Sequence, residues 1–232
     1  MSFIERINKK DDNIILDFYN GEDIKVEEDI ELQEISKDSN TIRICFLDVE
    51  TTGLKIPIFD KLSLIQISSG QDDAYIVQPD RKNYQCKNLV KLLNNKEILF
   101  VFHYARFDVN ALEYFLKVDI KKFYCTKVCS KIIRGYSQSH GLKDLVFEFI
   151  GKKLDKRYGQ TDWNKNLLSE ITDKQLEYAA NDCKFLISIK DKLNVMLERE
   201  GKKTLYEECL KFIKTRIKLD QIGITGDIFS HE

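Results

Sequence analysis

The chain has 232 residues, a length that suits one large domain or two small ones and excludes a multidomain assembly. Hydrophobic residues make up 43% of the chain and aromatic residues 11%, which is enough for a sizeable core and excludes an intrinsically disordered protein. The 37 basic and 38 acidic side chains nearly cancel, so the chain does not grip long duplex DNA through bulk positive charge, although metal ions or a local basic patch could still hold nucleic acid.

Segments typical of strands are rich in Ile, Val, Phe and Tyr, and they are NIILDFY (13–19), TIRICFLDV (41–49), KLSLIQISS (61–69), DAYIVQ (73–78) and EILFVFH (97–103). GQDD (70–73) predicts a tight turn, and with it an antiparallel meander. After residue 103 the apolar spacing becomes helical, and helices are predicted over 106–117, 125–136, 141–151, about 172–200 and 202–219. The helix over 172–200 is expected to begin with Thr172 as N-cap, because Gln175 three residues later completes a capping-box pattern. Strands followed by helices interleaved with strands predict an α/β fold with a mixed central sheet.

The sequence shows no obvious division into parts. No linker rich in Pro, Gly or Ser and no internal repeat is present, so we expect a single domain over residues 1–232. Residues 1–40 are expected to add an edge strand and a loop. The absence of a secretory pattern and of a long apolar run, together with six scattered cysteines, predicts a cytoplasmic protein without a membrane partner.

Acidic residues that could meet in one site occur in three places, each with an ordinary structural alternative. In DVETTGL, Asp48 and Glu50 lie two residues apart at a strand end and share one face of the sheet, unless they are simply solvated residues entering a turn. Asp108 in HYARFD lies in the first turn of a helix, where Asp often serves only the helix dipole. In YAAND, Tyr178 and Asp182 lie four residues apart on one helix face, which also suits a core Tyr and a surface Asp.

Together, the three motifs favour a shared site over three unrelated explanations. Four carboxylates that converge require positive charge, and two hard divalent cations with oxygen ligands would supply it. Two such ions about 3.5–4 Å apart activate water and stabilise both the attacking and the leaving oxygen of a phosphoryl displacement. Tyr178 is a poor base unaided, but beside a water at the metals it could orient that water or accept its proton.

The three motifs, DVETTGL, HYARFD and YAAND, resemble those of the DEDD exonuclease superfamily, and the Tyr four residues before the last Asp is typical of the DEDDy branch. His103 and Asp108 also form H-x4-D, the third motif of the DEDDh branch, but this pair precedes YAAND, so the DEDDh interpretation is rejected. The segments LSLIQIS (62–68), QTDW (160–163) and QLEYAANDCKFL (175–186) resemble the ribonuclease D catalytic domain. A second group is similar to the stand-alone nanoRNase C enzymes, and it comprises HYARFDVNAL, FYCTKVCSKIIR (123–134), HGLKDL (140–145) and TRIKLDQIGITGDIFSHE (215–232).

This resemblance covers about residues 41–232 and implies a ribonuclease H-like fold, two Mg or Mn ions and 3′-5′ exonuclease action. It implies metal-ligand roles for four acids, a water-orienting role for Tyr178, and thus a catalytic set of Asp48, Glu50, Asp108, Tyr178 and Asp182. It further implies that the substrate is short single-stranded RNA, down to 5′-phosphorylated dinucleotides, which is hydrolysed to nucleoside monophosphates. The implied assembly is a homo-oligomer, an octameric ring, with residues 201–232 as candidates for its contacts.

Five further residues are candidates for substrate binding: Leu54, His103, Arg134, His140 and Lys143. Leu54 matches the position where related enzymes insert an apolar wedge between two bases, and a turn residue packed on the core is the alternative. Arg134, His140 and Lys143 lie in a donor-rich segment, and our hypothesis is that some of them bind the 5′-phosphate or the scissile region, unless they belong to a solvated helix face. His103 could line the site or be a satisfied buried histidine.

Two other functions stay open. A general 3′-5′ exonuclease acting on longer RNA or DNA would use the same acids, and only a lid or a neighbouring subunit that blocks long strands would separate it from a short-RNA enzyme. A catalytically silent nucleic-acid-binding module on the same fold is a further alternative, which the presence of all four acids and Tyr178 disfavours.

Overall fold

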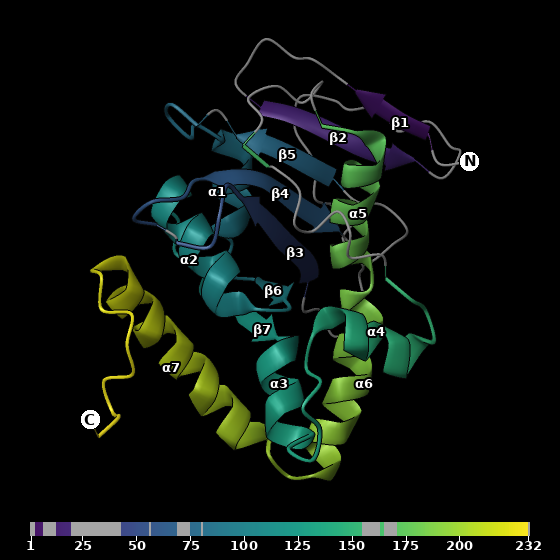
Figure 1. Cartoon of the computed structure of the whole chain (residues 1–232), viewed down its shortest axis with the longest axis vertical. Helices are drawn as coiled ribbons and strands as arrows, with labels where there is room; N and C mark the ends of the chain where they lie inside the picture. The colour runs from purple at the N-terminus through teal and green to yellow at the C-terminus, as the bar shows by residue number, and fades with distance from the viewer. Residues whose placement is uncertain are drawn as a thin grey trace.

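The computed structural model describes residues 3–6, 13–19, 43–55, 57–68, 75–79, 81–154, 163–164 and 171–231. These residues form a seven-stranded sheet in the order β1-β2-β5-β4-β3-β6-β7, with helices packed around it (Figure 1). The strands are β1 (Phe3–Arg6), β2 (Asn13–Tyr19), β3 (Arg43–Thr51), β4 (Leu62–Ser68), β5 (Tyr75–Pro79), β6 (Ile98–Phe102) and β7 (Phe123–Cys125). The predicted α/β fold with a mixed central sheet is confirmed.

Strand pairing reproduces the predicted meander and adds a parallel half. β3 pairs with β4 and β4 with β5, all antiparallel, whereas β6 runs parallel to both β3 and β7. The strand expected at residues 13–19 is present as β2, which pairs with β5, but β1 pairs with its other side and is the edge strand. β1 and the three-residue strand β7 are absent from our prediction, because so short a segment has too few residues for an alternating pattern. The predicted turn at 70–73 lies outside the described residues.

The helices are α1 (Lys87–Leu93), α2 (Ala105–Leu116), α3 (Thr126–Ile133), α4 (Leu142–Ile150), α5 (Asp173–Lys184), α6 (Leu186–Arg199) and α7 (Lys203–Gln221). The single helix predicted over 172–200 is wrong in one respect, because it consists of α5 and α6 separated by Phe185. Phe185 keeps right-handed helical dihedral angles, so the interruption is confined to one residue. Sequence analysis did not predict α1. None of the described helices is both long and apolar enough to cross a membrane.

Two apolar cores lie on opposite faces of the sheet because strand side chains alternate between the faces. One core joins alternate strand residues to α3, α4, α5 and α6, and its members include Phe46, Leu64, Ile76, Leu145, Ala179 and Ile189. The other joins the remaining strand residues to α1, α2 and α7, and its members include Leu47, Ile65, Val77, Leu93, Leu112 and Ile217. Residues 46, 48 and 50 of β3 therefore face α5, and this alternation decides which side of the sheet carries the acids.

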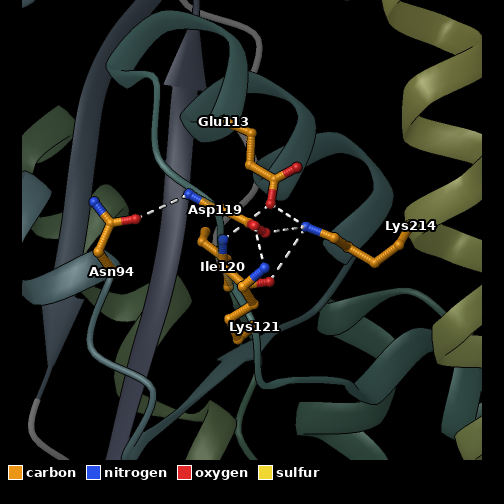
Figure 2. Close-up of polar contacts among 6 residues, drawn as sticks. All are labelled: Asn94, Glu113, Asp119, Ile120, Lys121 and Lys214. Carbon is orange, nitrogen blue, oxygen red and sulfur yellow. Dashed lines mark hydrogen bonds and ion pairs between the residues drawn. The ribbon is translucent and has the colours of Figure 1, made fainter.

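A polar network fastens α7 to α2 and to the segment that connects α2 with β7 (Figure 2). The Nζ atom of Lys214 in α7 forms an ion pair with Glu113 of α2 and contacts Asp119 Oδ1 and the Ile120 carbonyl oxygen, each at 3.3 Å. Glu113 also accepts a hydrogen bond from the Ile120 amide at 3.0 Å, and Asn94 accepts one from the Asp119 amide at 3.0 Å. Lys214 thus supplies the cation that a largely buried carboxylate needs on α2.

We expect Lys214→Met to lower the free energy of unfolding by about 1–2 kcal/mol, because it removes the cation beside the largely buried Glu113. The matched control is Lys211→Met on the same helix, whose partner Glu208 and own side chain are both exposed. That control should cost at most about 0.5 kcal/mol. Urea denaturation of both variants measures the difference, and equal losses would show that the network of Figure 2 does not stabilise the fold.

Candidate active site

Strand β3 carries the first two acids to the face of the sheet that α5 covers. Asp48 and Glu50 alternate with the buried Leu47 and Val49, so their carboxylates lie on the side opposite those apolar residues. The pairing of β3 with β4 shifts its register between Glu50 and Thr51, so the strand becomes irregular directly after the second acid.

Helix α5 carries the third acid and the tyrosine to the same place. The predicted capping box is present, since Thr172 Oγ1 accepts a hydrogen bond from the Gln175 amide at 3.3 Å and Gln175 Oε1 accepts one from the Thr172 amide at 3.1 Å. Asp182 is only 5% exposed, and α5 packs against β3, β4 and β5. Carboxylate oxygens of Asp48, Glu50 and Asp182 all lie within 4.8 Å of one another. The structure therefore brings together three acids that are 134 residues apart at most (182 minus 48).

Tyr178 lies beside these acids, one helical turn before Asp182. Burial raises the pKa of the Tyr178 hydroxyl, and the nearby charge of Asp182, a hydrogen bond to the Asp182 side chain, and the charges of Glu50 and Asp48 raise it further. The phenol therefore keeps its proton at neutral pH and acts as a hydrogen-bond donor.

Asp108 lies near these acids, at the start of α2, but outside the group of three carboxylates whose oxygens lie within 4.8 Å of one another. Because β3 and β6 are parallel, their carboxyl ends lie at the same edge of the sheet, and α2 begins shortly after β6. Asp108 is 3% exposed, and burial raises the pKa of its carboxyl to about 8. Backbone N–H groups, including that of Val49, favour its charged form, while the charge of Asp182 disfavours it. Asp108 is thus adjacent both to β3 and to the third acid.

The donor set suits hard divalent cations. All the converging side chains offer carboxylate oxygens, which are the ligands that Mg²⁺ and Mn²⁺ prefer. Oxygens that share one ion at about 2.1 Å are at most about 4.2 Å apart, so a group spread over 4.8 Å needs only a small side-chain adjustment. Burial is the main cause of the raised pKa of Asp108, and the charge of Asp182 adds to it, so a bound cation would favour the ionised form of both acids.

Two of the candidate substrate residues, Leu54 and His103, lie just after strands. Leu54 is 85% exposed in the segment after β3, which excludes the alternative of a turn residue packed on the core. His103 follows β6 and is half-buried, with its Nδ1 atom 2.9 Å from Thr126 Oγ1. Both residues therefore lie at the ends of strands that also lead to the acids.

Arg134, His140 and Lys143 have different surroundings from one another. Arg134 is 1% exposed, and its guanidinium donates to Ser130 Oγ at 2.9 Å and to the Ser139 carbonyl at 3.1 Å, and pairs with Glu148. His140 is half-buried against Ser130, and Lys143 is exposed on α4. Arg134 thus fixes the turn between α3 and α4, while its predicted contact with substrate stays a prediction.

Sequence analysis missed a cluster that positions the helix of Asp108. Arg106 donates two hydrogen bonds of 2.8 Å to Asp220 of α7, and Arg216 donates to the same carboxylate. Burial would raise the pKa of Asp220, but the hydrogen bonds from Arg106 and Arg216 more than offset it and lower the pKa. The i,i+4 spacing of Arg216 and Asp220 is a signal in the sequence, whereas the contact with Arg106 requires the tertiary structure.

Comparison with known proteins identifies the family. A family model described as 3′-5′ exonuclease matches residues 24–198. The chain belongs to this 3′-5′ exonuclease family. It is 31% identical to the ribonuclease D of Gluconacetobacter diazotrophicus over 61% of this chain, and 33% identical to the DNA polymerase I of Aquifex aeolicus over 79%. This 3′-5′ exonuclease chain spans about a third of the length of these curated relatives, 35% and 30% respectively.

Solved structures give matches over nearly whole chains. The Mg²⁺-bound structure of Brucella melitensis NrnC has a TM-score of 0.75 at 35% identity, covering 84% of this chain and 94% of that chain. The structure of the same protein bound to pGG has a TM-score of 0.76 at 36% identity, covering 84% of this chain and 93% of that chain. The family resemblance inferred from the motifs, and the predicted enzyme class of a hydrolase of the 3′-5′ exonuclease type, are thereby confirmed.

We expect the metal-free 3′-5′ exonuclease to lose stability as the pH rises from 5 to 8. The folded protein keeps the Asp108 proton up to about pH 8, whereas an unfolded chain releases it near pH 4, so the folded state binds more protons in this interval. Asp108→Asn removes this titration and should raise the free energy of unfolding at pH 8 by more than about 1 kcal/mol, with a smaller gain at pH 5.

The measurement is urea denaturation in the presence of a chelator at both pH values. Asp144→Asn is the matched control, because Asp144 occupies the first turn of α4 but is exposed. An Asp108→Asn variant that gains no more at pH 8 than at pH 5 would contradict the raised pKa.

Proposed function

We propose that this 3′-5′ exonuclease hydrolyses short RNA to nucleoside monophosphates with two divalent cations, Mg or Mn. The observation that carries the proposal is the meeting of the Asp48, Glu50 and Asp182 carboxylates within 4.8 Å, with Asp108 adjacent. The Mg²⁺-bound state of Brucella melitensis NrnC, at 35% identity over 84% of this chain, supports the proposal of a divalent cation.

The four acids hold the cations in this proposal, and Tyr178 orients the attacking water. When bound, the cations would supply activation of water and stabilisation of the charge that develops on the phosphoryl group. The raised pKa of Tyr178 keeps the proton on its hydroxyl, which donates it in a hydrogen bond to Asp182, so the phenolic oxygen is left to accept a hydrogen bond from the water. Asp182 therefore has two tasks, which are to bind a cation and to hold the phenol.

Short RNA is the proposed substrate because the related NrnC was solved bound to pGG. Leu54 is the candidate wedge between bases, since an exposed apolar side chain directly after the acidic strand is available to a stacked base. His103, His140 and Lys143 are the candidate donors to phosphate, and Arg134 would contribute by holding the turn that carries His140.

A general 3′-5′ exonuclease on longer RNA or on DNA is the second candidate function. The observation that favours it is the similarity to the DNA polymerase I of Aquifex aeolicus, which extends over 79% of this chain. The chemistry at the acids would be the same, so only the selection of strand length distinguishes the two functions.

A homo-oligomer, an octameric ring, is also part of the proposal. Exposed apolar side chains gather after β3, at Ile58 and Phe59, and in the C-terminal tail, at Ile222 and Phe229. The two segments adjoin, since a Cβ atom at Gly223 would lie 4.0 Å from Ile58 Cδ1. Such a patch is typical of a surface that contacts another chain. Light scattering after size-exclusion chromatography measures the particle mass, and a monomer at micromolar concentration would contradict the ring.

We place the enzyme in the cytoplasm because of its thiols. None of the six cysteines, all of which the structure describes, forms a disulfide, and five of them are buried. A reducing compartment keeps such thiols unpaired, whereas an oxidising one favours disulfides.

For substrate length, we expect 5′-labelled RNA dinucleotides to be consumed faster than ten-nucleotide RNA in the presence of Mn²⁺. The reason is that a site built for two nucleotides loses binding energy when a longer strand must be accommodated. Initial rates for a series of lengths, with DNA of matched sequence as the comparison, measure the preference. Faster decay of the longer strands would favour the second candidate function.

For the site, we expect Asp182→Asn to lower turnover by about 10³-fold or more, because the substitution removes both a cation ligand and the anionic acceptor of the Tyr178 hydroxyl. The control is Asp191→Asn on α6, an exposed aspartate beside Lys190, which should stay within about twofold of the unmodified enzyme. Release of labelled mononucleotide measures turnover, and thermal melting verifies folding. Undiminished turnover in the Asp182 variant would refute the proposed site.

A further inference from the structure

A buried glutamine on β4 has no role in the site described so far. Gln66 is 0% exposed, and among the described residues neither its Oε1 nor its Nε2 atom has a hydrogen-bond partner. A buried polar group without a partner costs about 1–3 kcal/mol, and native proteins contain few of them. Such a group therefore requires an explanation.

The strand register brings Gln66 to Asp48. The two residues are direct partners in the antiparallel pairing of β3 with β4, and directly opposed side chains share one face with Cβ atoms about 4.5–5.5 Å apart. On its other side Gln66 is opposite Ile76 of β5. Gln66 therefore has a carboxylate on one side and an aliphatic side chain on the other.

The face that Gln66 occupies is the one covered by α5. Its neighbours in sequence, Ile65 and Ile67, belong to the opposite core, whereas Leu64 belongs to the core that α5 completes. Helix α5 packs against β3, β4 and β5 and supplies Asp182 to the acidic group. The amide of Gln66 thus lies beneath the helix that closes the candidate active site.

Packing alone does not account for a glutamine at this position. Leu64 and Ile76 fill the same face without polar atoms, and a methionine would fill the volume of Gln66 without an unmet donor or acceptor. The free-energy cost of burying this amide is offset only in a state of the protein in which the amide has a hydrogen-bond partner. The acids of β3 change their environment when cations bind, and Asp48 is the one that the register places opposite Gln66.

We propose that Gln66 is a positioning residue for Asp48, and this proposal rests on the proposed function. In the cation-loaded enzyme the Gln66 Nε2 atom donates a hydrogen bond to the Asp48 carboxylate oxygen and thereby fixes its orientation. Mutation of a residue that hydrogen-bonds to a metal ligand typically lowers metal affinity or activity by about 10–100-fold. Gln66 can reach Asp48 by rotation about its own side-chain torsions, so the strands need not move.

The test compares Gln66→Met with Gln78→Met. Methionine keeps the length and approximate volume of glutamine but cannot donate a hydrogen bond. Gln78 is also a buried glutamine, on β5, and β4 separates it from β3. Mn²⁺ binding is measured from the electron paramagnetic resonance signal of free Mn²⁺, and thermal melting is measured with a chelator and with saturating Mn²⁺. Gln66→Leu serves as a second variant in case methionine packs poorly.

We expect Gln66→Met to weaken Mn²⁺ binding by about 10–100-fold while its chelator-treated form melts at or above the temperature of the unmodified protein. Gln78→Met should bind Mn²⁺ as the unmodified protein does. A purely structural glutamine would give the reverse, with a lower melting temperature in chelator and unchanged Mn²⁺ binding, and this result would overturn the proposal.

The proposed function and the role of Gln66 can fail separately. If the unmodified protein binds Mn²⁺ and cleaves RNA but Gln66→Met and Gln66→Leu bind Mn²⁺ equally well, only the role of Gln66 is refuted. If the unmodified protein binds no Mn²⁺, and Asp48→Asn does not change RNA cleavage, the metal site itself is refuted and the role of Gln66 with it.

Discussion

Mutual repulsion of carboxylates at one end of the central sheet is the constraint on which the site depends. Asp48, Glu50 and Asp182 offer oxygens within 4.8 Å of one another, and Asp108 is buried beside them with a pKa of about 8. No local preference would gather these charges, because like charges in a poorly solvated space disfavour one another. They are held together by apolar packing of α2 and α5 against the two faces of the sheet. The fold therefore supplies the free energy that keeps these carboxylates close together.

The C-terminal helix contributes to this arrangement although it lies beyond the residues that match the family model, 24–198. α7 contacts α2 at two places, through Lys214 with Glu113 and through Asp220 with Arg106, and α2 carries Asp108. Arg216 extends the same cluster to the carbonyl of Gly226 at 2.8 Å. The C-terminal helix is thus linked through partly buried ion pairs to the helix that carries Asp108.

In the proposed function, affinity for RNA comes from a small region, because the net charge of the chain is −1. Long polyanions are bound by many Lys and Arg contacts, and a chain with balanced charge gains little from such contacts. Cations at the acids and a few donors near His140 would instead hold one or two phosphates. So small a number of phosphate contacts agrees better with a short substrate than with a folded RNA.

The sequence by itself determined the periodic features of this protein. A high content of Ile, Val, Phe and Tyr identified the strands from β2 to β6, helical spacing identified α2 to α4 and α7, and the Thr172 capping box located the start of α5. The order of the three acidic motifs, including Tyr178 four residues before Asp182, indicated the family before any coordinates. These signals are local, because side-chain periodicity and capping depend on residues a few positions apart.

Only the tertiary structure decided which residues face one another across elements. Burial of the Arg134 guanidinium, the contact of Arg106 with Asp220, and the position of Gln66 opposite Asp48 depend on strand register and helix packing. The sequence also did not predict the break at Phe185 or the short elements β1, α1 and β7, since none of them produces a long periodic pattern. Contacts between distant segments are set by how whole elements pack, and a sequence pattern records the face of an element but not its partner.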